Sequence, residues 1–229
     1  MHVPDGFLDA PTSAATGAVA VAVVGVALAK ARDELDDKTA PMAGLVAAFI
    51  FAVQMLNFPV GAGTSGHLMG GALAAVLVGP WTGVLCVSVV LGVQALLFAD
   101  GGITALGTNI VLMAVTTVLV GWLVFRVLQA VLPKRMSLAA VQAGIAAFAS
   151  VPVAALVFVL LYSAGGTADI PLDTLVTAMF GVHTLIGIGE GVITFFTVGA
   201  ILAVRPDLVY GARRVLARRE LVIKPAVPA

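Results

Sequence analysis

The sequence predicts an all-α integral membrane protein with seven transmembrane helices. Of its 229 residues, 61% are hydrophobic and 10% are charged, whereas a soluble domain carries about 25% charged residues. The mean hydropathy of +1.13 agrees with this class. Seven apolar runs are continuous and not alternating, which favours helices, since only helices and closed barrels satisfy their backbone within lipid. The composition excludes a soluble globular protein.

The first four apolar runs are separated by short breaks. The first covers about 12–29 and ends at a charged loop, and the second covers about 41–57. A stretch rich in Gly, Pro, Ser and Thr, residues 59–66, then interrupts the helical pattern. The third run, about 67–79, is too short to cross a hydrocarbon core of about 30 Å, so it is tilted or begins from a re-entrant loop. The fourth covers about 81–98.

The last three apolar runs lead to a basic tail. They cover about 104–132, 137–163 and 175–204. Residues 1–204 are therefore predicted to form a transmembrane bundle, and residues 205–229 a cytoplasmic tail. Five arginines lie between Arg205 and Arg219 with apolar residues among them, which predicts an interfacial helix. This helix is either a positively charged anchor or a docking surface for a cytoplasmic partner.

The basic residues predict an N-terminus outside the cell and a C-terminus in the cytoplasm. With seven crossings in that orientation, all twelve Lys and Arg residues fall on the cytoplasmic side. The outer segments instead carry Asp5, Asp9, Asp100, Asp169 and Asp173. These acids are either ordinary loop residues or a rim that raises the local concentration of cations.

Several familiar kinds of site are missing from the sequence. The formal net charge is zero, so no nucleic-acid footprint exists. The single Cys86 excludes an internal disulfide or a cysteine metal cluster. Gly61 and Gly66 have the spacing of a phosphate-binding loop, but His67-Leu68 replaces the Lys and Ser/Thr of that motif. The sequence therefore predicts no ATPase and, without an HExxH motif, no metalloprotease.

The first two residues, Met1-His2, form a candidate chelating unit. The terminal amine, the His2 amide nitrogen and a His2 ring nitrogen can face one cation through two fused chelate rings. A planar all-nitrogen set favours Ni(II) or Cu(II), and a second imidazole could fill the fourth position. Residues 1–11 contain no Lys or Arg, so we expect no signal peptide and a mature chain that begins at Met1. The alternative is an incidental histidine on a mobile terminus.

His67 is the candidate for the second imidazole. It begins the third apolar run and follows the glycine-rich break. With the N-terminus outside, His67 lies on the same side of the membrane as Met1-His2, which a shared metal requires. It is either a metal ligand or a packing histidine, since an ionisable side chain at membrane depth is a functional candidate.

Other polar residues in the apolar runs are candidates for supporting roles. His183 and Glu190 are seven residues apart and so face the same side of one helix. Glu190 either anchors a ligand or relays a cation, or it forms an interhelical hydrogen bond that locks the bundle. Asn57 and Asn109 are expected to be buried, and either could hydrogen-bond to a ligating imidazole.

Four stretches of the sequence carry a resemblance to a known family: Met1–Leu8, Asn57–Val60, Gly63–Leu68 and His183–Glu190. They resemble the cobalt/nickel substrate-binding membrane component (CbiM/NikM family) of energy-coupling factor (ECF) transporters, over residues 1–204. The resemblance implies a seven-helix subunit whose extracellular N-terminus enters the bundle. It also implies a planar metal site of four nitrogens, from the Met1 amine, the His2 amide, the His2 ring and the His67 ring.

The resemblance further implies a transport subunit that is not itself an enzyme. Its partners would be a transmembrane coupling protein, two cytoplasmic ABC-type ATPase subunits that hydrolyse ATP, and a small accessory membrane protein. The complex would import divalent cobalt, feeding cobalamin synthesis, or nickel, across the plasma membrane of a prokaryote. Some nickel members carry the accessory domain fused at the C-terminus, so the short tail after residue 204 favours the cobalt branch.

A second class of function is an intramembrane enzyme or a stand-alone secondary metal carrier that uses His67, His183 and Glu190. A proton-driven carrier usually has more than one buried carboxylate, whereas Glu190 is the one acid near the middle of a predicted span. The sequence therefore favours the importer subunit over this class.

Overall fold

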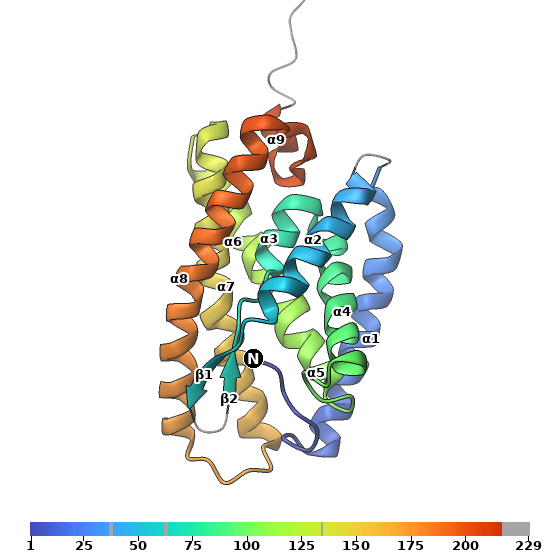
Figure 1. Cartoon of the computed structure of the whole chain (residues 1–229), viewed down its shortest axis with the longest axis vertical. Coiled ribbons are helices and arrows are strands. Elements are labelled where there is room, and N and C mark those ends of the chain that lie inside the picture. Colours follow the sequence, from blue (N-terminus) through green and yellow to red (C-terminus); the bar gives the residue numbers. More distant parts are fainter. Residues whose placement is uncertain (37–38, 62–63, 134, 217–229) are drawn as a thin grey trace, which may run out of the picture.

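The computed structural model describes residues 1–36, 39–61, 64–133 and 135–216. Its helices run roughly along the long axis of the molecule and form a bundle (Figure 1). The elements are α1 (Ala10–Lys30), η1 (Ala31–Asp33), α2 (Thr39–Gln54), β1 (Phe58–Gly61), β2 (Thr64–Gly66), α3 (Gly71–Val78), α4 (Pro80–Leu97), α5 (Leu106–Asn109), η2 (Ile110–Thr116), α6 (Thr117–Val131), α7 (Met136–Gly165), α8 (Leu172–Val204), η3 (Pro206–Leu208), η4 (Tyr210–Ala212) and α9 (Arg213–Leu216). The η labels denote 3₁₀ turns, except for η2, which is a π-helical segment.

Five helical segments of the described chain are long and apolar enough to cross a membrane. They are Ala10–Asp33, Pro80–Leu97, Leu106–Val131, Met136–Gly165 and Leu172–Val204. All seven predicted runs form helices, which confirms the helical membrane protein in part. Seven full spans are not found, because α2 is shorter than the five and α3 has only eight residues. At 1.5 Å per residue, α3 is about 12 Å long and cannot cross a bilayer.

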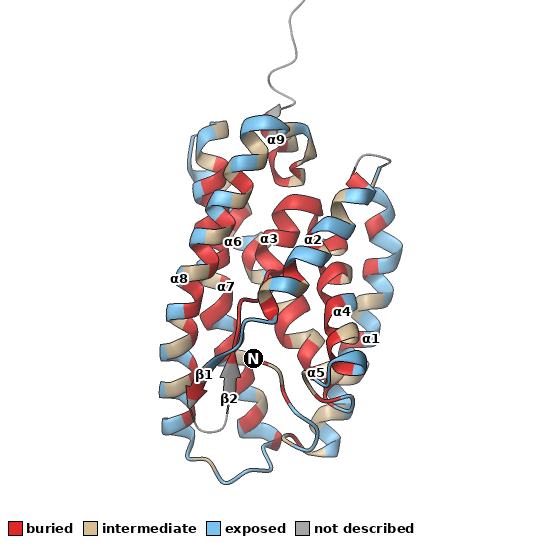
Figure 2. Ribbon diagram, viewed as in Figure 1, coloured by how far each residue is buried: buried red, intermediate tan, exposed pale blue. Residues whose placement is uncertain are grey.

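The short helix α3 lies at the centre of the bundle. All of its residues are buried (Figure 2). A side chain at Gly71 would come within 1.8 Å of the Thr117 hydroxyl, and one at Gly121 would come within 2.4 Å of Ala72. These glycines let α3 and α6 approach closely, as small residues do between membrane helices. The third apolar run is therefore a core helix, which explains why it is apolar on every side.

The glycine-rich break after α2 forms an antiparallel hairpin, which the sequence did not predict. Strands β1 and β2 pair Phe58 with Gly66, with an irregularity in register between Pro59 and Gly61. A side chain at Gly66 would come within 2.6 Å of the Ile186 side chain on α8. Only a glycine lets β2 lie this close to α8. The hairpin delivers the chain from α2 to the start of α3.

The tail does not form the predicted interfacial helix over 205–219. After α8 the described chain makes two 3₁₀ turns and one short α-helical turn. Gly211 is buried, and its carbonyl accepts a hydrogen bond of 2.8 Å from the Gln129 amide on α6. Pro206 and Gly211 interrupt a helix here, and this contact folds the tail back onto the bundle. The last three residues of the expected helix lie outside the described chain.

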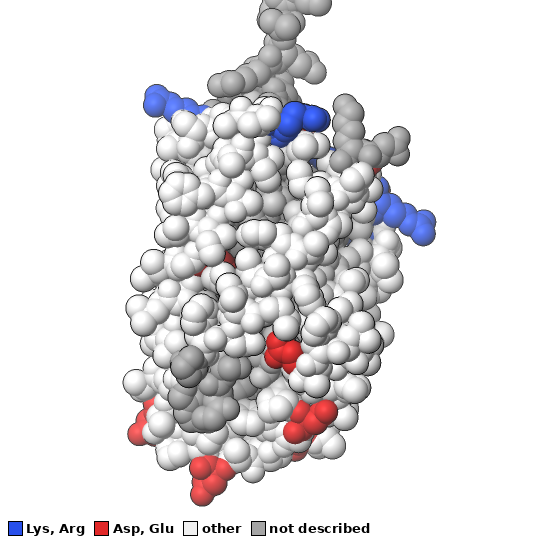
Figure 3. Space-filling view, viewed as in Figure 1, with Lys and Arg blue, Asp and Glu red and all other residues white. Residues whose placement is uncertain are grey.

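Basic side chains lie at one end of the bundle and are not seen at the other (Figure 3). Lys and Arg gather at the end that carries α9, here called the tail end. Acidic side chains mark the other end, here called the hairpin end, where the hairpin and the α7–α8 connection lie. The positive-inside pattern predicts such a separation between the two faces of a membrane.

The first nine residues enter the bundle from the hairpin end (Figure 1). Leu8 forms a β-bridge with Gly166, and the Asp9 carboxylate caps α1 by accepting the Thr12 N–H at 2.8 Å. Beyond this anchor the segment turns inward, so that Met1 is 2% exposed and Val3 is fully buried. The terminus is therefore packed inside the protein and is not the mobile end that the alternative interpretation assumed.

Candidate metal centre

The imidazole rings of His2 and His67 lie against each other. Their centroids are 4.4 Å apart, and the ring planes are inclined by 27°. His67 is fully buried, and the His2 side chain is 4% exposed. The N-terminal segment carries His2 to this place, and the connection between β2 and α3 carries His67. The structure thus brings together the two histidines that the sequence singled out.

One nitrogen of His67 is held and the other is left free. Its Nδ1 lies 2.8 Å from the Leu68 carbonyl, an acceptor, so Nδ1 carries the hydrogen. The buried Nε2 then presents a lone pair and has no hydrogen-bond partner among the described residues. Burial, followed by the nearby N-terminus, lowers the pKa of the His67 ring well below 6.5. The ring is therefore neutral at pH 7, as metal binding requires.

The His2 ring is arranged in a similar way. Its Nε2 lies 3.1 Å from the Gln94 side-chain oxygen on α4. Its Nδ1 lies 3.1 Å from the Asp100 carboxylate, although the angles do not make a hydrogen bond. Nδ1 is the ring nitrogen that can close a six-membered chelate ring with the backbone nitrogen of the same residue. Gln94 therefore holds the distal nitrogen and leaves the chelating one turned toward Asp100.

The amine of Met1 is buried beside these rings. Burial lowers its pKa from 8.0 to about 4, and the Asp100 charge opposes this shift only in part. A neutral amine has a lone pair to donate, whereas an ammonium has none. Within the described chain, neither this amine nor the His2 backbone N–H makes a hydrogen bond. Both backbone nitrogens of the predicted chelate are therefore available.

Asn109 fixes the N-terminal segment in register. The Val3 N–H donates to Asn109 Oδ1 at 2.7 Å, and Asn109 Nδ2 donates to the Val3 carbonyl at 3.1 Å. The Gly102 N–H donates to the same carbonyl at 2.9 Å. In the described chain, Asn109 therefore binds the backbone of Val3 and makes no hydrogen bond to an imidazole. It holds the backbone directly after His2 and so sets where the terminal nitrogens lie.

Glu190 anchors the segment that carries His67. Its two carboxylate oxygens accept the N–H groups of Met69 at 2.5 Å and Gly70 at 2.8 Å. These donors precede the first turn of α3, where the helix dipole favours a negative charge. The contact joins α8 to α3, which is the interhelical lock that the sequence offered as one interpretation. It also fixes the peptide groups beside Leu68, whose carbonyl orients the His67 ring.

His183 lies behind the hairpin and outside the pair of stacked rings. Its Nδ1 lies 2.8 Å from the Met179 carbonyl in the same helix. Its Nε2 is buried without a hydrogen-bond partner in the described chain and faces Gly66, where a side chain would come within 3.3 Å of it. In the described residues, no three His, Cys, Asp or Glu side chains come together as a metal site. A site here would need backbone nitrogens.

The structure corrects one expected residue, adds Gln94, and places Asp100, one of the outer acids, against His2. Asn57 is exposed and not buried, because α2 ends at Gln54 and Asn57 lies in the connection to the hairpin. It makes a minor contribution to lowering the pKa of Asp100, after the contact with the His2 ring. Sequence reasoning missed the roles of Gln94 and Asp100. An amide inside the fourth apolar run was the available signal for Gln94.

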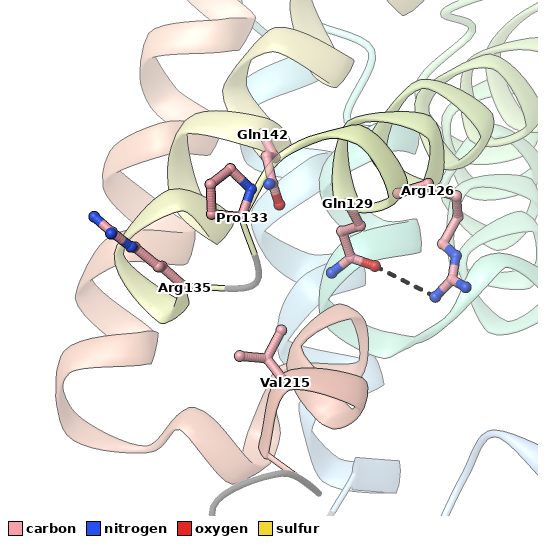
Figure 4. Close-up of a pocket in the computed structure, with 7 residues that line it drawn as sticks. Arg126, Gln129, Pro133, Arg135, Gln142 and Val215 are labelled. Atoms are coloured by element: carbon pink, nitrogen blue, oxygen red, sulfur yellow. Dashed lines mark hydrogen bonds between the residues drawn. The ribbon is translucent and has the colours of Figure 1, made fainter.

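A separate hollow of about 150 Å³ lies at the tail end (Figure 4). It is lined by Arg126, Gln129, Ala130, Pro133, Arg135, Gln142 and Val215. Arg126 donates to the Gln129 side chain at 3.3 Å, and Gln129 donates to the tail backbone. These polar groups bind one another and the tail. The hollow therefore lies where the tail packs against the bundle, and it offers no nitrogen donors for a metal.

The described donors at the hairpin end suit a transition metal. Four nitrogens are free, and the two rings are held by Gln94 and by the Leu68 carbonyl so that one nitrogen of each remains unbound. Nitrogen donors select Ni(II), Cu(II) and related ions, whereas calcium and magnesium prefer oxygen. These residues are therefore a candidate centre for a divalent transition metal.

Comparison with known proteins shows similarity along most of the chain. The CbiM family model, described as a cobalt uptake substrate-specific transmembrane region, matches residues 2–208. A protein of Haloquadratum walsbyi that is named for metal transport is 43% identical over 210 residues, covering 92% of this chain and 94% of its own. The fused nickel transport protein NikMN of Rhodobacter capsulatus is 36% identical over 222 residues, covering 91% of this chain and 63% of its own.

A solved structure shares the fold. The crystal structure of a truncated transition metal transporter matches with a TM-score of 0.81 and 32% identity. The match covers 89% of this chain and 99% of that chain. The bundle described above is thus an architecture that occurs in a transition metal transporter.

Proposed function

The chain belongs to the CbiM family of cobalt/nickel transport membrane proteins, and from this premise we propose that it captures Co(II) or Ni(II) with its own N-terminus. It is a multi-pass membrane protein of a prokaryote and a transporter component, not an enzyme. In the proposed orientation the hairpin end faces outward and the tail end faces the cytoplasm. The metal ion is the transported substrate.

The proposed ligands are the Met1 amine, the His2 amide nitrogen, His2 Nδ1 and His67 Nε2. The observation that carries this proposal is that the two ring nitrogens are buried and unpaired in the described chain, while the other nitrogen of each ring is occupied. Asn109 and Glu190 support the set by fixing the backbone next to His2 and His67. On binding, the His2 amide releases a proton and the metal takes its place.

The proposed transport cycle is that of an ECF-type importer. The chain would bind metal, and a transmembrane coupling protein with two cytoplasmic ATPase subunits and a small accessory membrane protein would drive its release. The support is the family membership and the absence of a phosphate-binding loop from the sequence. We propose cobalt, destined for cobalamin synthesis, as the first substrate to test and nickel as the second, since the four nitrogens accept both.

The decisive experiment separates the terminal amine from His2. Four glutamines inserted between Met1 and His2 leave every original side chain present but move the amine too far along the chain to close a chelate ring with His2. Isothermal titration of Co(II) and Ni(II) should show that affinity is lost in this variant. Four glutamines added after Ala229 are the matched control, and this variant should bind as the parent does. Equal affinity in both variants would refute the proposed ligand set.

Coupling to ATP is tested separately. In liposomes that contain only this chain, we expect bound metal at the membrane but no accumulation inside. Co-reconstitution with the coupling protein and the ATPase subunits should produce ATP-dependent accumulation. Uptake by the chain alone, driven by a proton gradient, would identify a secondary carrier instead.

A further inference from the structure

Asp100 stands between the hairpin end and the His2 ring. Its Oδ1 lies 3.1 Å from His2 Nδ1, and its side chain is 21% exposed whereas that of His2 is 4% exposed. The second oxygen, Oδ2, is buried and has no hydrogen-bond partner among the residues that the structure describes. Buried acceptors of this kind are rarely left unpaired in a finished structure. Asp100 therefore touches the ring nitrogen of the candidate centre and keeps one oxygen free.

A hollow of about 250 Å³ lies beside Asp100 at the hairpin end. It is lined by Pro4, Asp5, Ala95, Ala99, Gly101, Gly102 and Ile103. Its lining therefore includes both chain neighbours of Asp100 and two residues of the N-terminal segment. The hollow therefore lies beside the backbone on both sides of Asp100, whose own side chain is not part of the lining.

The loop that carries Asp100 is held in one conformation. Ala99 has φ of 51° and Gly101 has φ of 90°, so the backbone on both sides of Asp100 is in the left-handed region. A side chain at Gly101 would come within 3.0 Å of Asn109, and one at Gly102 within 2.4 Å of the Asp5 nitrogen. The close fit between this loop and the N-terminal segment fixes the carboxylate where the two meet.

The charge of the proposed complex requires a counter-charge. A divalent ion bound to one deprotonated amide and three neutral nitrogens carries a net charge of +1. A buried, unpaired charge is costly in a medium of low dielectric constant. Asp5 is engaged by the Thr104 backbone N–H at 2.7 Å, and Glu190 by the backbone at α3. Asp100 is the carboxylate in direct contact with the chelating unit, and its single negative charge makes the complex neutral.

We propose, on the basis of the metal-capture function above, that Asp100 receives the cation and then serves as its counter-charge. In the metal-free chain the carboxylate lies 3.1 Å from His2 Nδ1. A hydrated divalent cation that arrives at the hairpin end first meets the partly exposed Asp100 carboxylate, and the four nitrogens then replace its water molecules. The His2 amide proton leaves to the solvent as the metal–nitrogen bond forms, and no electron is transferred. Asp100 stays beside the complex.

The test uses Asp100→Asn, which keeps the shape of the side chain and removes its charge. Stopped-flow mixing of the purified full-length protein with Ni(II) should show association at least about tenfold slower, because a charged mouth speeds cation capture. The dependence of this rate on salt should also weaken. The absorption band of planar four-nitrogen Ni(II) should still form, since all four nitrogens remain. Asp169→Asn, an exposed acid in the α7–α8 connection, should match the parent.

Two results would overturn the proposal. One is an Asp100→Asn variant that associates as fast as the parent with the same salt dependence. The other is a changed Ni(II) band with an unchanged salt dependence, which would show that Asp100 only positions His2. The insertion of four glutamines after Met1 tests the chelate independently, because it should abolish the band whatever Asp100 does. If the parent protein shows no Ni(II) band, the four-nitrogen chelate is refuted. The role of Asp100 in receiving the cation is not refuted by that result.

Discussion

Two acidic side chains near opposite ends of the bundle hold their carboxylates differently. At the tail end, the buried Glu34 carboxylate accepts the backbone N–H groups of Trp81 at 3.2 Å and Thr82 at 2.7 Å, one on each oxygen. It thereby satisfies free donors in the first turn of α4. At the hairpin end, Asp100 places one oxygen against the His2 ring and leaves the other unpaired in the described chain.

This difference separates a carboxylate that completes the fold from one that lies beside the candidate metal centre. Glu34 has both oxygens occupied by backbone N–H groups, so its carboxylate has no free oxygen. Around Asp100, unpaired buried atoms gather on neighbouring side chains: Oδ2 of Asp100, Nδ1 of His2 and Nε2 of His67. A cation would satisfy all of them, whereas at the tail end a cation would find no free carboxylate oxygen on Glu34.

The largest effect on metal affinity is expected from removing the fourth nitrogen, His67 Nε2. His67→Ala should weaken Ni(II) and Co(II) binding by more than about 100-fold, beyond what the loss of an outer-shell partner costs. His183→Ala is the control, because it removes another buried imidazole next to the same hairpin. Isothermal titration measures both, and thermal unfolding checks that both variants fold. A larger loss in His183→Ala than in His67→Ala would show that His183, and not His67, is the ligand.

The next effect is the dependence on pH. The lowered pKa values of the Met1 amine, about 4, and of His67 leave both groups unprotonated between pH 6 and 8. The proton released by the His2 amide then governs this range, so affinity should rise about tenfold per pH unit. Below about pH 4, protonation of the amine should weaken binding further. Titrations at several pH values with one fixed metal measure the slope, and a flat profile from pH 6 to 8 would exclude the amide as a ligand.

A smaller effect is expected from the residue that holds the terminus in register. Asn109→Ala removes both hydrogen bonds to Val3 and should weaken metal binding by about 10- to 100-fold. The expected cause is loss of position, so the Ni(II) band should broaden or diminish. Gln142→Ala is the control, because it removes another buried amide at the tail end of the bundle. Equal affinities in the two variants would show that Asn109 does not organise the chelate.

The smallest effect concerns the tail end. Gln129→Ala removes the hydrogen bond to the Gly211 carbonyl and should lower the free energy of unfolding by about 1 kcal/mol. Metal affinity should stay unchanged, because the hollow there holds no donor of the centre. Denaturant unfolding and metal titration of the same sample measure the two quantities. A loss of metal affinity in this variant would show that the two ends are coupled.

The helices could be predicted from the sequence because segments that lie in a lipid bilayer must be long and apolar. Apolar runs marked all seven helical segments, and their ends fell within a few residues of those observed. The run that forms α3 has no amphipathic periodicity, because a helix that is buried on all sides has no polar face. Its place in the core could therefore not be predicted from its pattern. The hairpin was missed since Gly and Pro signal an interruption without saying whether two strands pair. The prediction of a helix over the tail was wrong because Pro206 and Gly211 interrupt the helix that the basic pattern indicated.

The candidate centre was predictable only in part. Met1, His2 and His67 were recognisable from residue type and position, and the resemblance supplied their arrangement. Gln94 and Asp100 were not, because their roles depend on which residues two loops and a helix bring within 3.1 Å of one ring. Glu190 stood out as an isolated acid, but its partners are backbone N–H groups, and a sequence does not show which ones are free.

The burial of Met1 has a consequence for anyone who labels the protein. With 2% of Met1 exposed, an added residue at the front would have to fit inside a packed helical bundle. An extension before Met1 is therefore as disruptive as a larger side chain at a core position. A purification tag or a fluorophore belongs at the other terminus.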